Sequence, residues 1–195
     1  DTWEPVLSTP VPLCLNVAVS PDYISDHTVI AVCGKVYKST NGGNTWDAIS
    51  KGVPANVLHL ASSPGYPQDG TLFAALEMQG VYKSTDYGRT WASANQDLDF
   101  WVVDYVAVSP NYTQDQTVFV SDSWKGVSRS TNGGKQWSHM TDLYGKVFIS
   151  PQFQTDRQVF LATSKGFYRS TDAGASWSLL FDEEIKQVWF SPDYL

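Results

Sequence analysis

Carboxylates that could hydrolyse a glycosidic bond are sparse in this sequence. Such a reaction uses two carboxyl groups that face each other across a sugar, so they come from segments that fold together rather than from neighbouring residues. The tight acidic cluster of the chain is Asp182, Glu183 and Glu184. Because these three residues are consecutive, we interpret them as a solvated loop and expect no catalytic residue among them.

Metal, nucleophile and cofactor chemistry have equally little support. The three histidines, His27, His59 and His139, have no partner at the spacing of a metal site, and no serine–histidine–aspartate or cysteine–histidine arrangement is legible. Glycine pairs occur, but none follows a strand and opens a helix as a phosphate-binding loop does. We therefore expect no bound metal and no cofactor.

A repeated octet indicates which elements must position any functional side chain. It runs from a serine to a tryptophan and returns after 45, 46 and 40 residues. We expect each copy to be a tight turn whose Asp or Asn accepts backbone hydrogen bonds and whose tryptophan fills the gap between two sheets. The copies begin at Ser39, Ser84, Ser130 and Ser170, place Asn41, Asp86, Asn132 and Asp172 third and Gly43, Gly88, Gly134 and Gly174 fifth, and end at Trp46, Trp91, Trp137 and Trp177.

A Ser-Pro pair recurs in phase with the octet, first at Ser20–Pro21, and in the four complete copies an aspartate such as Asp26 follows the proline five residues later. Between these markers lie short runs rich in Val, Ile, Phe and Tyr, which are typical of strands. Four such runs in each period match one propeller blade. The sequence therefore predicts an all-β propeller of four-stranded antiparallel blades. We expect full repeats at about 12–51, 55–96, 101–142 and 145–182, with partial blade strands at 1–11 and 185–195.

These octets resemble the Asp-box, or BNR repeat, the Ser-x-Asp-x-Gly-x-Thr-Trp motif of sialidases, sortilin-type receptors and many secreted bacterial propellers. The resemblance covers essentially the whole chain and implies the propeller fold. It implies little about function, because the motif occurs in hydrolases, receptors and assembly factors alike. Asn41 and Asn132 depart from the motif, and since an amide carries no charge they argue against calcium binding at these turns.

Sialidase activity is not expected. A sialidase clamps its substrate carboxylate with three arginines, whereas Arg129 and Arg169 here occupy a repeat position that Lys38 and Lys83 hold in the other copies. A basic residue that recurs once in each blade is better interpreted as structural or solvated than as a substrate clamp. The Arg-Ile-Pro segment that sialidases carry near their start is also missing.

The composition narrows the range of partners. A net charge of −7 and a pI near 4.7 argue against nucleic acid and against an anionic membrane surface. No run of apolar residues is long enough to insert into a bilayer. Cys14 and Cys33 are too few for a disulfide scaffold, so we favour two free buried thiols, with a cross-strand disulfide as the alternative.

Both ends of the sequence match parts of the repeat. Residues 1–3 read like the end of an octet, and Ser191–Pro192 like the start of a further repeat. An unclosed propeller would expose strand edges. We therefore expect a segment of a larger propeller, or one whose edges are completed by missing blades or by a second copy.

Two groups of residues are candidates for ligand binding. Because first strands line the channel of a propeller, the polar residues that precede their apolar runs are expected at the channel mouth; the competing interpretation is ordinary strand ends in water. They are Asn16, His59, Tyr105, Lys146 and Gln187. The loop aromatics Phe100, Trp101 and Trp124 suit stacking on sugars or anchoring a protein, although packing between blades is the favoured interpretation.

These observations together favour non-catalytic recognition of a glycan or protein ligand by an extracellular or envelope-associated propeller. The alternatives are a fragment of a secreted glycoside hydrolase, like the xyloglucan-degrading enzymes with Asp-box propellers, or an assembly factor like those of photosystem II. The hydrolase hypothesis predicts an open cleft with two carboxylates from different blades and aromatics beside them. The recognition hypothesis predicts a surface of mixed polarity without such a pair.

Overall fold

Four antiparallel sheets of four strands each make up the computed structural model, which describes residues 14–54, 56–99, 102–191 and 194. Strand order in every sheet follows the chain, and the predicted fold class, a β-propeller, is confirmed. The strands are β1 (Asn16–Val19), β2 (Val29–Cys33), β3 (Lys35–Ser39) and β4 (Asp47–Ala48); β5 (Val57–Ser62), β6 (Leu72–Leu76), β7 (Gly80–Ser84) and β8 (Ala92–Ser93); β9 (Tyr105–Val108), β10 (Val118–Ser121), β11 (Val127–Ser130) and β12 (Ser138–Thr141); β13 (Lys146–Ile149), β14 (Val159–Thr163), β15 (Gly166–Ser170) and β16 (Ser178–Phe181).

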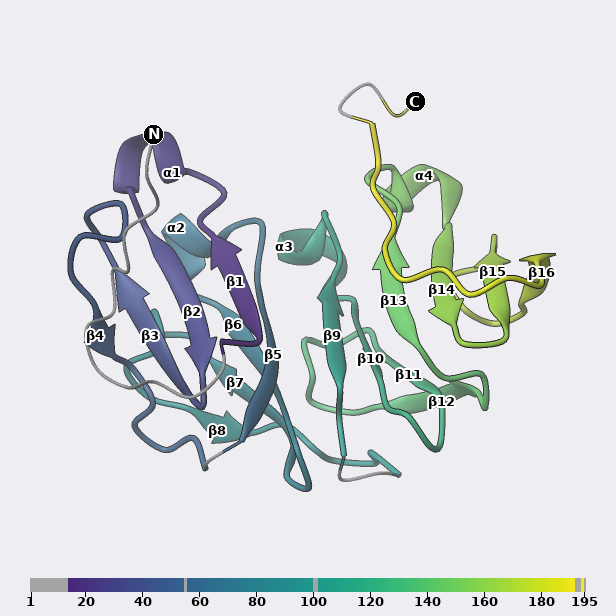
Figure 1. Ribbon diagram of the computed structural model, residues 1–195, viewed down its shortest axis with the longest axis horizontal. Helices are drawn as coiled ribbons and strands as arrows, with labels where there is room; N and C mark the ends of the chain where they lie inside the picture. The colour runs from purple at the N-terminus through teal and green to yellow at the C-terminus, as the bar shows by residue number, and fades with distance from the viewer. Residues whose placement is uncertain (1–13, 55, 100–101, 192–193, 195) are drawn as a thin grey trace.

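The first strand of each sheet lies toward the middle of the array. Neighbouring first strands contact one another, β1 with β5, β5 with β9, and β9 with β13. Figure 1 shows these strands around the middle of the molecule and the fourth strands at its periphery. Over the residues described, the blades form an open arc. Side chains at the starts of the first strands therefore point into a shared central space rather than onto an outer surface.

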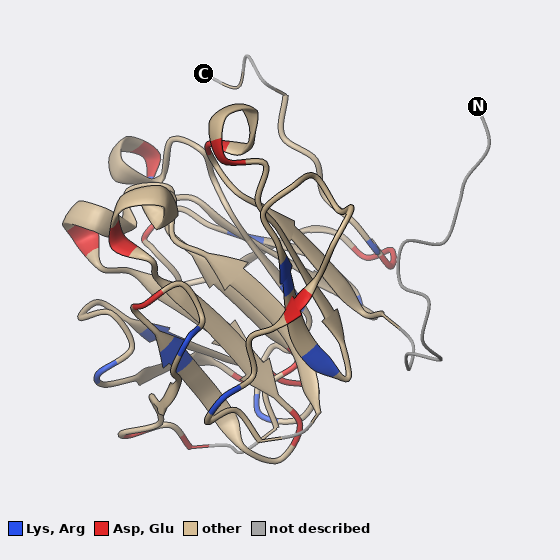
Figure 2. Ribbon diagram, turned by 90° about the vertical axis from the view of Figure 1, so that its left-hand side faces the viewer, with Lys and Arg blue, Asp and Glu red and all other residues tan. Residues whose placement is uncertain are grey.

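A helical turn joins the first and second strands of every blade. We expected a simple turn at each Ser-Pro pair, but the structure has α1 (Tyr23–Asp26), α2 (Tyr66–Asp69), α3 (Tyr112–Asp115) and α4 (Phe153–Asp156). The repeated aspartate explains the local geometry: Asp26 accepts hydrogen bonds from Ser20 Oγ at 2.6 Å and from Thr28 N at 2.8 Å. Figure 2 shows these helical turns, with their acidic residues, gathered at one end of the molecule.

The octets are the turns between third and fourth strands, and all of them close in the same way. The hydroxyl of Ser39 accepts the N–H of Gly43 at 2.9 Å and donates to Asn41 Oδ1 at 2.9 Å. The Asn41 Oδ1 atom in turn accepts the N–H of Thr45 at 2.9 Å. The other octets repeat these bonds through Ser84, Ser130 and Ser170. Asparagine and aspartate thus do the same work in the turn, as the sequence predicted.

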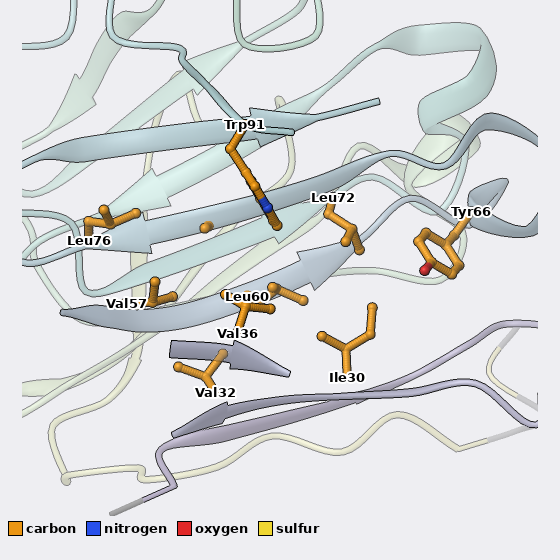
Figure 3. Close-up of a cluster of buried hydrophobic side chains, with 10 residues drawn as sticks. Ile30, Val32, Val36, Val57, Leu60, Tyr66, Leu72, Leu76 and Trp91 are labelled. Carbon is orange, nitrogen blue, oxygen red and sulfur yellow. The ribbon is translucent and has the colours of Figure 1, made fainter. Parts of the chain in front are cut away.

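The central octet tryptophans are wedged between blades. Trp91 is buried, and its Nε1 donates to the carbonyl of Ile49 in the preceding blade at 2.8 Å. Figure 3 shows Trp91 directed at an apolar layer that contains Val32 of the first blade and Leu72 of the second. Trp137 makes the same kind of contact with the second blade. The blade interfaces are therefore apolar cores, each fastened by an indole hydrogen bond.

The first and last octet tryptophans are only half-buried. Trp46 and Trp177 donate their Nε1 hydrogen to a glycine of their own octet, Gly43 at 2.8 Å and Gly174 at 3.0 Å. Trp177 still packs in the cluster between the third and fourth blades, beside Met140. The wedge predicted for every octet is thus present for Trp91, Trp137 and Trp177.

The basic residues ahead of the octets also join neighbouring blades. Lys83 Nζ donates to the Gly133 carbonyl at 2.9 Å, and Arg129 Nη1 donates to the Ala173 carbonyl at 2.7 Å. In each pair the acceptor lies in the octet of the next blade. For these two positions the structural interpretation is confirmed.

Cys14 and Cys33 form a disulfide, so the favoured prediction of two free buried thiols is wrong. Cys33 ends β2 and is buried, whereas Cys14 precedes β1 and is exposed. The adjoining residue Leu15 donates its N–H to the Val32 carbonyl at 2.8 Å, which holds the two segments side by side. The link fixes the chain immediately before β1.

Partial blade strands were expected at both ends of the chain, and the structure describes only one of these two segments. Residues 1–11 lie outside the described part of the chain. Ile185–Ser191 has no strand assignment, because none of the described strands pairs with it. It nevertheless lies on the fourth blade, where the rings of Phe190 and Phe160 are 5.7 Å apart.

The octet aspartates predict a specific acid response. Thr90 donates its hydroxyl to Asp86 at 2.6 Å and its backbone N–H at 2.8 Å, and these bonds lower the pKa of Asp86 to about 2. A carboxylate with a depressed pKa contributes stability that is complete above its unfolded pKa and is lost as the pH falls through its folded pKa. Asp86→Asn is therefore expected to flatten the fall in urea stability between about pH 4 and pH 2.

The matched variant is Asn41→Asp, since Thr45 stands in the same relation to Asn41 as Thr90 does to Asp86. This variant should steepen the fall in urea stability between about pH 4 and pH 2, while leaving stability near neutral pH almost unchanged. Parallel acid limbs for Asp86→Asn and the unmodified chain would contradict the assignment.

Candidate functional site

A central cavity is lined by the first strands of the blades. It has a volume of ≈ 780 Å³ and includes residues from β1, β5, β9 and β13. All of the polar positions that break the repeat line it: Asn16, His59, Tyr105, Lys146 and Gln187. They meet because each starts, or nearly starts, a first strand, and the blades set these strands side by side at the end opposite the helical turns.

One wall of the cavity carries Asn16 and His59. Asn16 Oδ1 accepts the N–H of Leu60 at 3.1 Å, so its amide nitrogen keeps both hydrogens for other partners. Burial, followed by the positive charge of Lys146, lowers the pKa of His59 to about 4. The imidazole is therefore neutral near pH 7, and its buried Nδ1 has no hydrogen-bond partner.

Tyr105 and Lys146 continue the lining on the next two blades. The ring of Tyr105 is 5.3 Å from the ring of His59, and the ammonium group of Lys146 lies 5.2 Å from the Tyr105 ring centre. A cation over an aromatic face is attracted by the ring quadrupole, which holds the lysine in the cavity. Three consecutive blades thus contribute adjoining polar groups of different chemistry.

A carboxylate that the sequence analysis missed also lines the cavity. Asp104 immediately precedes β9, and its Oδ2 accepts a short hydrogen bond from the hydroxyl of Ser123. Among the described residues of the lining, Asp104 is the one acid. The absence of an octet or a Ser-Pro marker at this position explains why the repeat gave no signal for it.

Trp124 follows Ser123, a residue of the cavity lining, on a loop held by hydrogen bonds to Asp122. The loop joins β10 to β11 at the Tyr105 end of β9, since Ser121 pairs with Tyr105. Asp122 is buried, and its Oδ1 accepts the backbone N–H groups of Trp124 at 2.8 Å, Lys125, and Gly126 at 2.9 Å. The Trp124 side chain is 81% exposed, so the favoured prediction that it packs between blades is wrong.

The shape of the loop requires glycine at one position. Gly126 has a φ of +100°, and a Cβ there would lie 2.0 Å from the Thr141 carbonyl oxygen. The pattern of Asp122 followed four residues later by Gly126 is a signal that could have identified this loop, because a buried aspartate commonly caps the N–H groups of a tight turn. The aromatics Phe100 and Trp101 lie outside the described residues.

A second, smaller cavity adjoins the first. Its volume is ≈ 340 Å³, and it shares Tyr105, Ser123 and Lys146 with the central cavity. Its lining adds Tyr144 and Glu184. The two cavities therefore adjoin through these shared residues, and their linings mix polar, aliphatic and aromatic side chains.

The described residues contain neither a metal-binding cluster nor a membrane-spanning helix. No group of three or more His, Cys, Asp or Glu side chains there is placed to hold a metal ion. None of the helices in the same part of the chain has the length and apolar character needed to cross a membrane.

Comparison with known proteins supports the fold. No family model matches the chain. It is 33% identical over 96 residues to a probable oligoxyloglucan-reducing end-specific xyloglucanase from Neosartorya fischeri, an alignment covering 46% of this chain and 11% of the relative.

Similar solved structures also include glycoside hydrolases. The chain is similar to an ancestral GH74 enzyme (TM-score 0.68, 22% identity, 99% of this chain and 26% of that one). It also resembles YCF48 bound to D1 peptide (TM-score 0.70, 15% identity, 98% of this chain and 64% of that one). A third similar structure is the GH74 xyloglucanase of Xanthomonas campestris (TM-score 0.70, 18% identity, 92% of this chain and 32% of that one). At these identities the likeness establishes the β-propeller fold. The chain spans less than two thirds of the length of each of these proteins.

Proposed function

We propose that this chain is a recognition segment of an Asp-box propeller, and that its central cavity binds a glycan or protein ligand without catalysing a reaction. The observation that carries the proposal is the meeting of Asn16, His59, Tyr105, Lys146 and Gln187 around one cavity. Where the octets repeat for structural reasons, these positions differ in every blade. Side chains that vary at one equivalent place suit a particular ligand rather than the scaffold.

The chemistry of the cavity favours a glycan. Its wall presents hydrogen-bond donors and acceptors, and the exposed Trp124 directly follows the lining residue Ser123 in the chain. Sugars combine hydroxyl groups with flat apolar faces, so they are bound by polar groups together with aromatic platforms. The Asp122 hydrogen bonds hold the loop that carries Trp124, which lowers the entropy lost when a ligand stacks on it.

The disulfide supports an extracellular or envelope location. Cys14–Cys33 has an exposed partner, and disulfides persist in oxidising compartments whereas cytosolic reductants remove them. The xyloglucanase named among the similar proteins acts on a glycan, which agrees with exposure to polysaccharides.

Trp124→Ala tests the proposal. Glycan-array screening should identify a bound oligosaccharide, and titration calorimetry with that oligosaccharide should show its affinity falling by about tenfold or more in the variant. The matched control is Trp189→Ala, which removes an equally exposed tryptophan (86%) from the segment after β16 instead of from the β10–β11 loop; neither tryptophan is among the residues that line the cavity itself. Equal effects of the two variants, or no glycan bound by the unmodified chain, would contradict glycan recognition.

A glycoside hydrolase is the second candidate, because Asp104 and Glu184 come from different blades and border adjoining cavities. Release of reducing ends from xylogluco-oligosaccharides, abolished by Asp104→Asn, would favour it over simple recognition. The protein-ligand form of the proposal, suggested by the YCF48 structure with its peptide, predicts capture of an extended peptide in place of a sugar.

A further inference from the structure

The central cavity contains a cation, Lys146, that forms no ion pair among the described residues, although Glu184 lines the adjoining smaller cavity with it. Lys146 is half-buried at the start of β13, and among the described residues its ammonium group forms no ion pair and no hydrogen bond within the protein. The ammonium group instead makes a cation–π contact with the Tyr105 ring. A half-buried ammonium group loses part of its hydration, and an anionic ligand group would restore that stabilisation.

Neighbouring donors converge on the same space. The amide nitrogen of Asn16 has no hydrogen-bond partner among the described residues, while its Oδ1 atom accepts the Leu60 N–H. Tyr105 and His59 line the same cavity. A carboxylate accepts several hydrogen bonds at once, so a cation flanked by neutral donors is an arrangement suited to it.

The acid of the cavity is already engaged. Asp104 accepts the hydroxyl hydrogen of Ser123, and no ion pair joins it to Lys146 among the described residues. Its carboxylate belongs to the segment before β9, whereas Lys146 belongs to the next blade. The cavity therefore has an acceptor side, suited to sugar hydroxyls, and a cationic side.

We propose that the glycan bound in this cavity is acidic, with a hexuronate carboxylate placed against Lys146 and supported by Asn16 and Tyr105. The inference rests on the proposed function, since it names the class of glycan that the same cavity takes. It differs from what the xyloglucanase relative would suggest, because xyloglucan backbones are neutral.

The experiment compares uronate-containing oligosaccharides with the same oligosaccharides after reduction of their carboxyl groups, first on an array and then by titration calorimetry. Acidic forms should bind at least tenfold more tightly than their reduced partners. Lys146→Met should weaken the acidic forms by about tenfold to a hundredfold. The reduced forms should bind the variant as they bind the unmodified chain, which also shows that the variant is folded.

Two further variants sharpen the result. Lys146→Arg keeps the charge and should retain the preference for acidic forms. Lys135→Met removes one charge from an exposed lysine in the third octet, at the end away from the cavity, and should change neither affinity. Equal binding of acidic and reduced forms would overturn the inference and leave glycan recognition standing. Binding of neither form would overturn both.

Discussion

Replacing Trp137 by alanine is expected to destabilise the protein by about 3–5 kcal/mol. The side chain is 4% exposed and packs with Phe73 and Val81 of the second blade and Val120 of its own. Its Nε1 also donates to the Ala94 carbonyl at 2.7 Å. The substitution removes a large apolar volume from a blade interface and leaves the Ala94 carbonyl without that partner. The lost packing and the lost hydrogen bond both destabilise the folded state.

Two variants separate these terms in urea unfolding followed by circular dichroism. Trp137→Phe keeps most of the packing and loses the Nε1 hydrogen bond, so it should cost about 1–3 kcal/mol. Trp124→Ala removes a tryptophan that is 81% exposed and should stay within about 0.5 kcal/mol of the unmodified chain. If Trp137→Ala unfolded at the same urea concentration as Trp124→Ala, the octet tryptophan would not be the wedge between blades.

The fold could be predicted from sequence because its determinants are local and repeated. An octet such as Ser84–Trp91 contains the hydroxyl, the carboxylate and the glycine that its own turn needs, and every bond closes within five residues. The strand pattern between octets then leaves few alternatives to a blade. The helical turns were missed because α1 to α4 are single turns, too short to show a helical period.

Residues of the candidate site could be predicted only where they occupy equivalent positions in successive repeats. Comparing equivalent positions identified Asn16, His59, Tyr105 and Lys146, and their common place in the blade brings them together. Asp104 and Ser123 lie outside those positions, and their hydrogen bond joins segments 19 residues apart. The exposure of a loop side chain depends on whether another blade packs against that loop. The exposure of Trp124 therefore could not be predicted from the local sequence either.

Reducing the Cys14–Cys33 disulfide is expected to lower the free energy of unfolding by about 3 kcal/mol, the entropy of closing a loop of roughly 20 residues in the unfolded chain. Urea unfolding with and without a reductant measures this directly. Reduction leaves both side chains in place, so the loss reflects the covalent link rather than packing. Cys14→Ala should show the reduced stability at once and no further response to reductant.

The same reduction is expected to reach the cavity, because the chain enters β1 directly after Cys14. Leu15 and Asn16 line the cavity, and Asn16 holds β5 through the Leu60 N–H. With the link open, Leu15 keeps its hydrogen bond to Val32 but loses the adjoining covalent tie to β2, so the start of the strand can fray. Glycan affinity should therefore fall on reduction, while Lys146 and Tyr105 keep their contact in the neighbouring blades. Faster hydrogen exchange confined to β1 would accompany that loss, whereas unchanged exchange at Leu15 and unchanged affinity would show that the disulfide stabilises the blade without ordering the site.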